Sequence, residues 1–129
     1  MDILVRALIV GAGGFVGSAA RFMASTWVQR VAPTTTLPLG TLAVNVLGCL
    51  AIGAIAGLAD HRWELSSSVW LFLVVGVLGG FTTFSAFGHE VFVLGSAGAR
   101  LHALLHVAMH LTLGLGAAWL GYEAATKLS

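Results

Sequence analysis

The chain has 129 residues, of which 58% are hydrophobic and only 9% are charged, and its formal net charge is +1. Soluble domains carry roughly 25% charged residues, so this composition excludes a soluble enzyme, a nucleic-acid binder and a disordered linker. The single cysteine, Cys49, excludes an intramolecular disulfide and a cysteine-based metal site. We therefore expect residues 1–129 to form a single small integral membrane domain.

Charged residues separate four apolar runs, each long enough to cross a bilayer as a helix. The runs predict helices at roughly 4–28, 37–59, 67–94 and 101–124. Apolar residues are continuous rather than alternating, which excludes a membrane β-barrel. A cleaved signal peptide is the alternative for the first run, but Arg21 stands where its cleavage site belongs. The sequence thus predicts an all-α membrane protein.

Two loops are evident between these runs. The charged cluster Asp60, His61, Arg62 and Glu64 marks one of them. The other contains Gly95, Ser96 and Gly98 and is closed by Arg100. Pro38 lies where the second helix is expected to begin, which suits a residue without an N–H.

Glycines recur four residues apart in three of the predicted helices, at Gly13 and Gly17, Gly53 and Gly57, and Gly76 and Gly80. This spacing is typical of helices that pack closely in lipid. The run GAGGFVG at residues 11–17 also approaches a dinucleotide-binding fingerprint, but valine occupies the third glycine position and no strand precedes it. Helix packing is therefore the preferred interpretation.

Arg21 lies on the same helical face as Gly14 and Gly17. Two interpretations are open for it: the guanidinium lines an aqueous vestibule that attracts anions, or it reaches toward the membrane surface.

The orientation of the chain in the membrane is not set by its basic residues. One side would hold Arg6, Arg62 and Lys127, and the other would hold Arg30 and Arg100, with Arg21 just inside the membrane. Because this bias is close to zero, we expect insertion in both orientations. Two copies of opposite orientation can then pair about a twofold axis in the membrane plane.

Asn45 is the strongly polar residue in the second apolar run, and Thr41 lies one turn before it on the same face. A carboxamide in hydrocarbon is costly unless it finds partners. Asn45 is therefore expected either to hydrogen-bond a neighbouring helix or to offer an N–H to a solute, and the second role is preferred.

The third run contains the sequence GGFTTFSAF at residues 79–87, which is a poor helix former and predicts a break near Gly79–Thr83. Freed carbonyl groups at the end of the first half-helix suit a cation, and the amide end near Thr83 suits an anion. Phe84 and Phe87 share a face beside Ser85, and their positive ring edges can contact a small anion.

Two further groups of titratable residues follow. Glu90 is expected to mark a vestibule, to form an interhelical hydrogen bond or, less favoured, to couple protons. His102, His106 and His110 form a stripe at four-residue spacing, for which pore lining, interhelical hydrogen bonding, a proton relay and metal binding are open.

Three runs, GGFVGSAARF at residues 13–22, PLGTLAVN at 38–45 and GGFTTFSAF at 79–87, together resemble the CrcB/Fluc family of small fluoride channels. Glu90 falls on a matching acidic position. The sequence departs from the family at Ala86, which replaces a common hydroxyl residue, and at His106 and His110, where tyrosine and serine are frequent.

The resemblance implies an antiparallel, dual-topology homodimer with two pores in a plasma membrane or inner membrane. It implies a structural sodium ion at the dimer centre, held by the main-chain carbonyls of Gly79 and Thr82. It also implies that fluoride passes Asn45 and the rings of Phe84 and Phe87.

Further expectations follow from these residues. The resemblance implies that Ser85 and Thr41 supply hydroxyls to the fluoride path, and Arg21 and Glu90 are expected to line its vestibule. Such a protein would export fluoride passively, relieve fluoride toxicity and catalyse no reaction.

Two alternative functions are considered. A small multidrug transporter also has four spans and unbiased topology, but it needs a carboxylate in the first span. A membrane scaffold would need neither Asn45 nor a broken third helix. Antibiotic-cation efflux and fluoride release from vesicles distinguish the three.

The histidines lead to a further expectation. A neutral imidazole donates one hydrogen bond and a protonated one donates two, so His110, more than His106, is expected to make fluoride flux depend on pH between about 5 and 8.

Overall fold

The computed structural model describes residues 1–33, 36–60 and 65–128, and the regular secondary structure of these residues is helical, with no strand among them. Four helical stretches are long and apolar enough to cross a membrane. Three of them are α1 (Ile3–Val31), α2 (Leu39–Asp60) and α6 (Arg100–Leu128). The remaining stretch, from residue 67 to residue 96, consists of α3 (Ser67–Trp70), η1 (Leu71–Leu78), α4 (Gly79–Phe81) and α5 (Phe84–Ser96). The all-helical class and the break in the third span are confirmed.

The helix ends differ from the predicted ones for local reasons. α1 continues to Val31 because Pro33 first constrains the backbone at Ala32. α2 begins at Leu39, after Pro38, since the Leu39 amide donates to the Leu37 carbonyl at 2.9 Å in a tight turn. α6 extends beyond the expected end, and its last turns carry a Glu123–Lys127 pair at 3.7 Å.

The two predicted loops have different outcomes. α5 ends at Ser96, and Gly98 adopts a φ of 79°, a left-handed conformation that glycine tolerates without steric cost. The Ala99 amide then donates to the Leu94 carbonyl at 2.9 Å, which closes the turn into α6. In the other loop, Asp60 ends α2, while His61, Arg62 and Glu64 lie outside the described residues.

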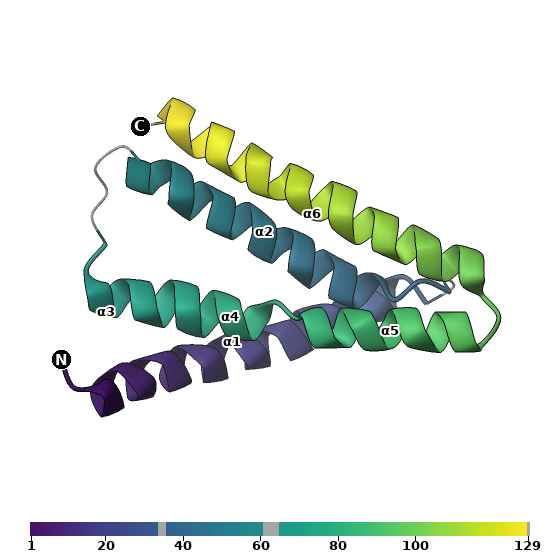
Figure 1. Cartoon of the computed structure of the whole chain (residues 1–129), viewed down its shortest axis with the longest axis horizontal. Coiled ribbons are helices and arrows are strands. Elements are labelled where there is room, and N and C mark those ends of the chain that lie inside the picture. Colours follow the sequence, from purple (N-terminus) through teal and green to yellow (C-terminus); the bar gives the residue numbers. More distant parts are fainter. Residues whose placement is uncertain (34–35, 61–64, 129) are drawn as a thin grey trace.

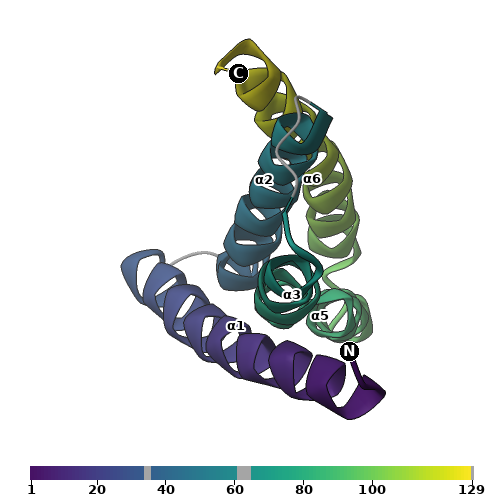
Figure 2. The same cartoon turned by 90° about the vertical axis from the view of Figure 1, so that its left-hand side faces the viewer.

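The helices form two pairs (Figure 1). α2 lies along α6, while α1 packs against η1 and α4, and α5 contacts α6. Both termini lie at the same end of the molecule, as an even number of spans requires. Figure 2 shows the same arrangement from that end, with the third span between α1 and the α2–α6 pair. The break therefore lies where the two pairs meet.

Glycines allow the helices of each pair to approach closely. A Cβ at Gly17 would overlap the Val77 carbonyl, and one at Gly80 would lie 2.6 Å from the Gly14 carbonyl oxygen. A Cβ at Gly53 would overlap the Ala118 carbonyl of α6. Backbone therefore meets backbone along these faces, which confirms the predicted small-residue packing.

η1 is a π-helix of eight residues within the third span, a feature that the sequence does not predict. π-turns use i→i+5 hydrogen bonds, are rare and often lie near functional sites. Here η1 leads directly into the broken segment. The run LFLVVGVL is apolar throughout, so no polar residue reveals the altered helical register.

Replacing Gly53 with alanine is expected to lower the free energy of unfolding by about 1–3 kcal/mol, because the added methyl group meets backbone that cannot yield. Gly116→Ala is the matched control on α6, since a Cβ there has nothing within 4 Å. Thermal unfolding in detergent measures the difference. Equal melting temperatures for the two variants would contradict close packing at Gly53.

Candidate functional site

The third span is interrupted by two extended threonines. Thr82 has φ −88° and ψ 157°, and Thr83 has φ −153° and ψ 122°. α5 restarts at Phe84 with Thr83 as its N-cap, whose hydroxyl oxygen accepts from the Ala86 amide at 3.2 Å. The local sequence therefore explains both the stop and the new start.

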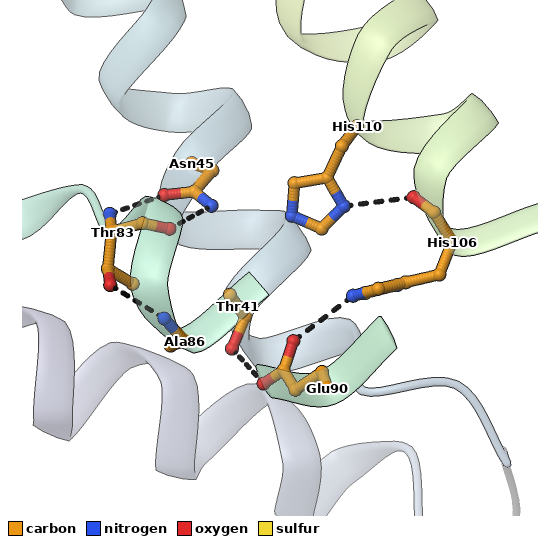
Figure 3. A network of polar contacts seen from close by, with 7 residues as sticks. All are labelled: Thr41, Asn45, Thr83, Ala86, Glu90, His106 and His110. Carbon is orange, nitrogen blue, oxygen red and sulfur yellow. Dashed lines mark hydrogen bonds and ion pairs between the residues drawn. The ribbon is translucent and has the colours of Figure 1, made fainter. Parts of the chain in front are cut away.

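Asn45 of α2 holds the break open by pairing with the backbone of Thr83 (Figure 3). The Thr83 amide donates to Asn45 Oδ1 at 2.8 Å, and Asn45 Nδ2 donates to the Thr83 carbonyl at 2.9 Å. A side-chain carboxamide thus satisfies both backbone groups of one extended residue, which is what buried backbone at membrane depth requires. The interhelical contact considered for Asn45 is present.

At the break, two backbone amides donate to side chains instead of to the carbonyl groups that they would meet in a continuous helix. In an unbroken helix the Thr83 amide would donate to Gly79 and the Ala86 amide to Thr82. Here they donate to Asn45 Oδ1 and to the Thr83 hydroxyl instead. The carbonyl groups of Gly79 and Thr82 thereby lose their helical donors.

Arg21 of α1 also reaches the break. Its Nε donates to the Gly80 carbonyl oxygen at 3.0 Å. The guanidinium therefore satisfies one carbonyl at the end of the first half-helix, where the helix dipole is negative. Neither of the two interpretations of Arg21 included this contact, because the sequence does not reveal which turn of the third span faces α1.

An open cavity of about 480 Å³ lies beside the break, between α2, the third span and α6. Its polar lining includes Asn45, Thr82, Thr83, His110 and Cys49. Cys49 was not selected as a site residue, although it follows Asn45 by one helical turn. Gly79, whose carbonyl has lost its helical donor, lines the same cavity. The cavity therefore has carbonyl oxygens that suit a cation and N–H and O–H donors that suit an anion.

Aromatic rings form one wall of this cavity. Phe84 and Phe87 have ring centroids 5.5 Å apart with an interplanar angle of 56°. Phe87 in turn lies 4.3 Å from the His110 ring, centroid to centroid. Phe84 is 83% exposed, so most of this ring is uncovered within a single chain.

Glu90 of α5 contacts side chains of α2 and α6 (Figure 3). Its Oε1 accepts a hydrogen bond from the Thr41 hydroxyl of α2, and its Oε2 lies 3.1 Å from Nε2 of His106 on α6. His106 is fully buried. The interhelical hydrogen bonds considered for Glu90 and His106 are therefore present.

Glu90 also lines a second cavity of about 340 Å³ together with Gln29, His89 and Pro38. This cavity lies at the end of α1 and the start of α2. Glu90 thus reaches a hollow at this end of the helices.

His110 has one ring nitrogen fixed and one free. Its Nδ1 lies 3.0 Å from the His106 carbonyl oxygen, and a carbonyl can only accept, so Nδ1 carries the proton. Its Nε2 is buried, and no hydrogen-bond partner for it exists among the described residues. The single N–H of a neutral His110 is therefore already used by the His106 carbonyl.

Of the three histidines in the stripe, His106 and His110 are in contact with each other. His106 and His110 rings are edge to face with centroids 4.4 Å apart, and their contact runs through a backbone carbonyl rather than from nitrogen to nitrogen. His102 is half-buried one turn away. In the described ranges no group of three or more His, Cys, Asp or Glu side chains is placed to hold a metal ion.

Ser85 is exposed at the start of α5, and its hydroxyl lies 3.3 Å from that of Thr83. Thr41, by contrast, is buried and directs its hydroxyl to Glu90. The residues selected from the sequence thus gather around one break, in two connected groups: Asn45, Thr82 and Thr83 with the aromatic rings, and Thr41, Glu90 and His106 below them.

Fold and site together define a multi-pass α-helical membrane protein whose polar groups converge on a helix break. The family model described as CrcB-like protein, Camphor Resistance (CrcB), matches residues 8–122, and the chain belongs to this family.

Curated relatives match over nearly the whole chain. The "Fluoride-specific ion channel FluC" of Methylobacillus flagellatus is 42% identical over 120 residues, covering 93% of this chain and 94% of that protein. Proteins of the same name from Nitratidesulfovibrio vulgaris and Elusimicrobium minutum are 41% and 40% identical, covering 90% and 97% of this chain and 93% and 97% of their own lengths.

Proposed function

We propose that this protein is a fluoride-selective channel that lets fluoride leave the cell passively and catalyses no reaction. The observation that carries the proposal is the Asn45–Thr83 pairing, which holds a helix break open beside a largely apolar cavity that a few polar groups line. Membership of the CrcB family and the names of the relatives support fluoride as the ion.

The chemistry of fluoride suits these groups. The ion is small and strongly hydrated, so a pore must replace its water with compact donors. An amide nitrogen carries two N–H groups, and Asn45 gives only one to Thr83, which leaves the other for an anion. The positive edges of Phe84 and Phe87 and the exposed Ser85 hydroxyl extend the row of donors.

We propose Gly79 and Thr82 as ligands of a structural sodium ion. Both carbonyls have lost their helical donors, both residues line the cavity, and carbonyl oxygens suit hard cations. Arg21 occupies the neighbouring Gly80 carbonyl, so that oxygen is engaged. A bound sodium ion would supply a fixed positive field near the anion path.

Two oxygens are too few for a sodium ion, and a second copy related by a twofold axis would double them. The antiparallel homodimer therefore fits the carbonyl arrangement, and it gives two pores, one for each chain. It would also cover the exposed ring of Phe84.

Dual topology predicts that a cysteine appended to the C-terminus is labelled from both sides of the membrane. The background is Cys49→Ala, so that the added thiol is the only one. Impermeant maleimide applied to sealed cells and then to lysed cells measures the two populations. We expect comparable fractions, and labelling from one side alone would refute the antiparallel dimer.

Fluoride release from loaded vesicles tests the proposed function. Purified protein is expected to release the fluoride when the membrane potential is clamped, while chloride-loaded vesicles retain theirs. Retention of fluoride would overturn the channel proposal. Uptake of a cationic dye driven by a proton gradient would favour a multidrug-type carrier instead.

A further inference from the structure

His110 faces the cavity with a nitrogen that lacks a partner. The ring lies between the Asn45 side and the His106 side of the site, and its second nitrogen points toward the side where Asn45 lies (Figure 3). That nitrogen, Nε2, is buried and has no hydrogen-bond partner in the described part of the chain. Both Asn45 and His110 line the same cavity.

The hydrogen bond at Nδ1 fixes what Nε2 offers. Because Nδ1–H donates to the His106 carbonyl at 3.0 Å, a neutral ring presents only a lone pair at Nε2. Asn45 and His110 together then offer the cavity that they line one donor and one acceptor, a combination that suits a water molecule. A lone pair repels an anion.

Protonation of the ring reverses this. The imidazolium presents Nε2–H, so the two residues together offer two donors and a positive charge, which suits a small anion. We propose that Asn45 and His110 form a conditional anion site that binds fluoride only together with one proton, held on His110 Nε2. This inference rests on the proposed fluoride channel and concerns the protonation state in which its site is occupied.

The neighbouring titratable groups on each packed element are few. His106 shares α6 with His110, Glu90 contributes a carboxylate from α5 through His106, and Cys49 contributes a thiol from α2. Within the described lining, the third span contributes hydroxyls, carbonyls and apolar side chains.

Fluoride titration by calorimetry in detergent, in buffers of different ionisation enthalpy, tests the proton directly. We expect the wild-type protein to take up about one proton per fluoride bound above the titration range of the imidazole, and its affinity to fall about tenfold for each pH unit there. His110→Gln places an amide N–H near the position of Nε2 at every pH. We expect it to bind fluoride with no proton uptake and with an affinity independent of pH.

Two further variants assign the proton. His106→Gln retains a donor to Glu90, and His102→Gln is the matched control one turn further along the stripe. Both are expected to keep the pH dependence of the wild type. Loss of that dependence in His106→Gln, or its persistence in His110→Gln, would overturn the assignment.

The outcome separates this inference from the proposed function. Fluoride release by the wild type with pH-independent binding would overturn the conditional site alone. Failure of the wild type to release fluoride at any pH would overturn the channel. The calorimetric measurement of proton uptake on fluoride binding would still show whether the conditional site exists. Fluoride binding that is absent at every pH would overturn the conditional site, whatever the release assay shows.

Discussion

Replacing Asn45 with leucine is expected to reduce fluoride efflux by about 100-fold or more, since two backbone groups of Thr83 lose their partners and each costs about 1–3 kcal/mol when buried. The Thr83 amide would return to the Gly79 carbonyl, which lies one helical turn before it. The break would then close and α5 would turn away from α6. The variant should also melt at a lower temperature than the wild type.

Flux from fluoride-loaded vesicles and melting temperature in detergent measure the two effects. Thr112→Val is the matched control, because it deletes one hydroxyl that donates to the Ala108 carbonyl at 2.7 Å within α6. Its flux and stability are expected to stay near those of the wild type. If Asn45→Leu conducts normally, the pairing with Thr83 is not what holds the path open.

The features that local sequence could predict are those with local causes. The low charge content sets the membrane environment, and the charged residues mark the ends of the spans. Two glycines followed by two threonines disfavour a helix wherever they occur, so the break at Thr82 and Thr83 follows from the segment itself.

Several contacts that the sequence does not predict lie between helices or between a helix and the break. Asn45 was expected to meet either a helix or a solute, but nothing within α2 shows that Thr83 lies opposite it. The same holds for Arg21 with Gly80 and for Glu90 with Thr41 and His106. These partners are 16 to 59 residues apart in sequence, so only the packing of the glycine faces brings them together.

The tautomer of His110 shows most clearly what the sequence alone cannot predict. The spacing of the histidines predicts a stripe on one face of α6, and that face does meet α5 and the cavity. Which nitrogen carries the proton depends on one hydrogen bond to the His106 carbonyl. A helical wheel does not show this hydrogen bond. The bond nevertheless decides whether Nε2 of a neutral His110 offers a donor or a lone pair.

Replacing Phe84 and Phe87 together with isoleucine is expected to reduce fluoride flux strongly while leaving the fold intact. Isoleucine keeps an apolar side chain of substantial volume but removes the positive ring edges that can contact an anion. The rings are well placed for this role, because their centroids are 5.5 Å apart and Phe87 lies 4.3 Å from the His110 ring. A fluoride ion that leaves water would find no replacement for its lost donors along an aliphatic wall.

Fluoride efflux from vesicles is the measurement, with melting temperature as the check on folding. Phe92→Ile is the matched control, since Phe92 lies on the same helix and its side chain is 70% exposed, but it does not line the cavity in the described part of the chain. We expect the control to conduct like the wild type. A folded double variant with unchanged flux would refute the ring-edge role and leave Asn45, Ser85 and the protonated His110 as the donors that replace the water of the ion.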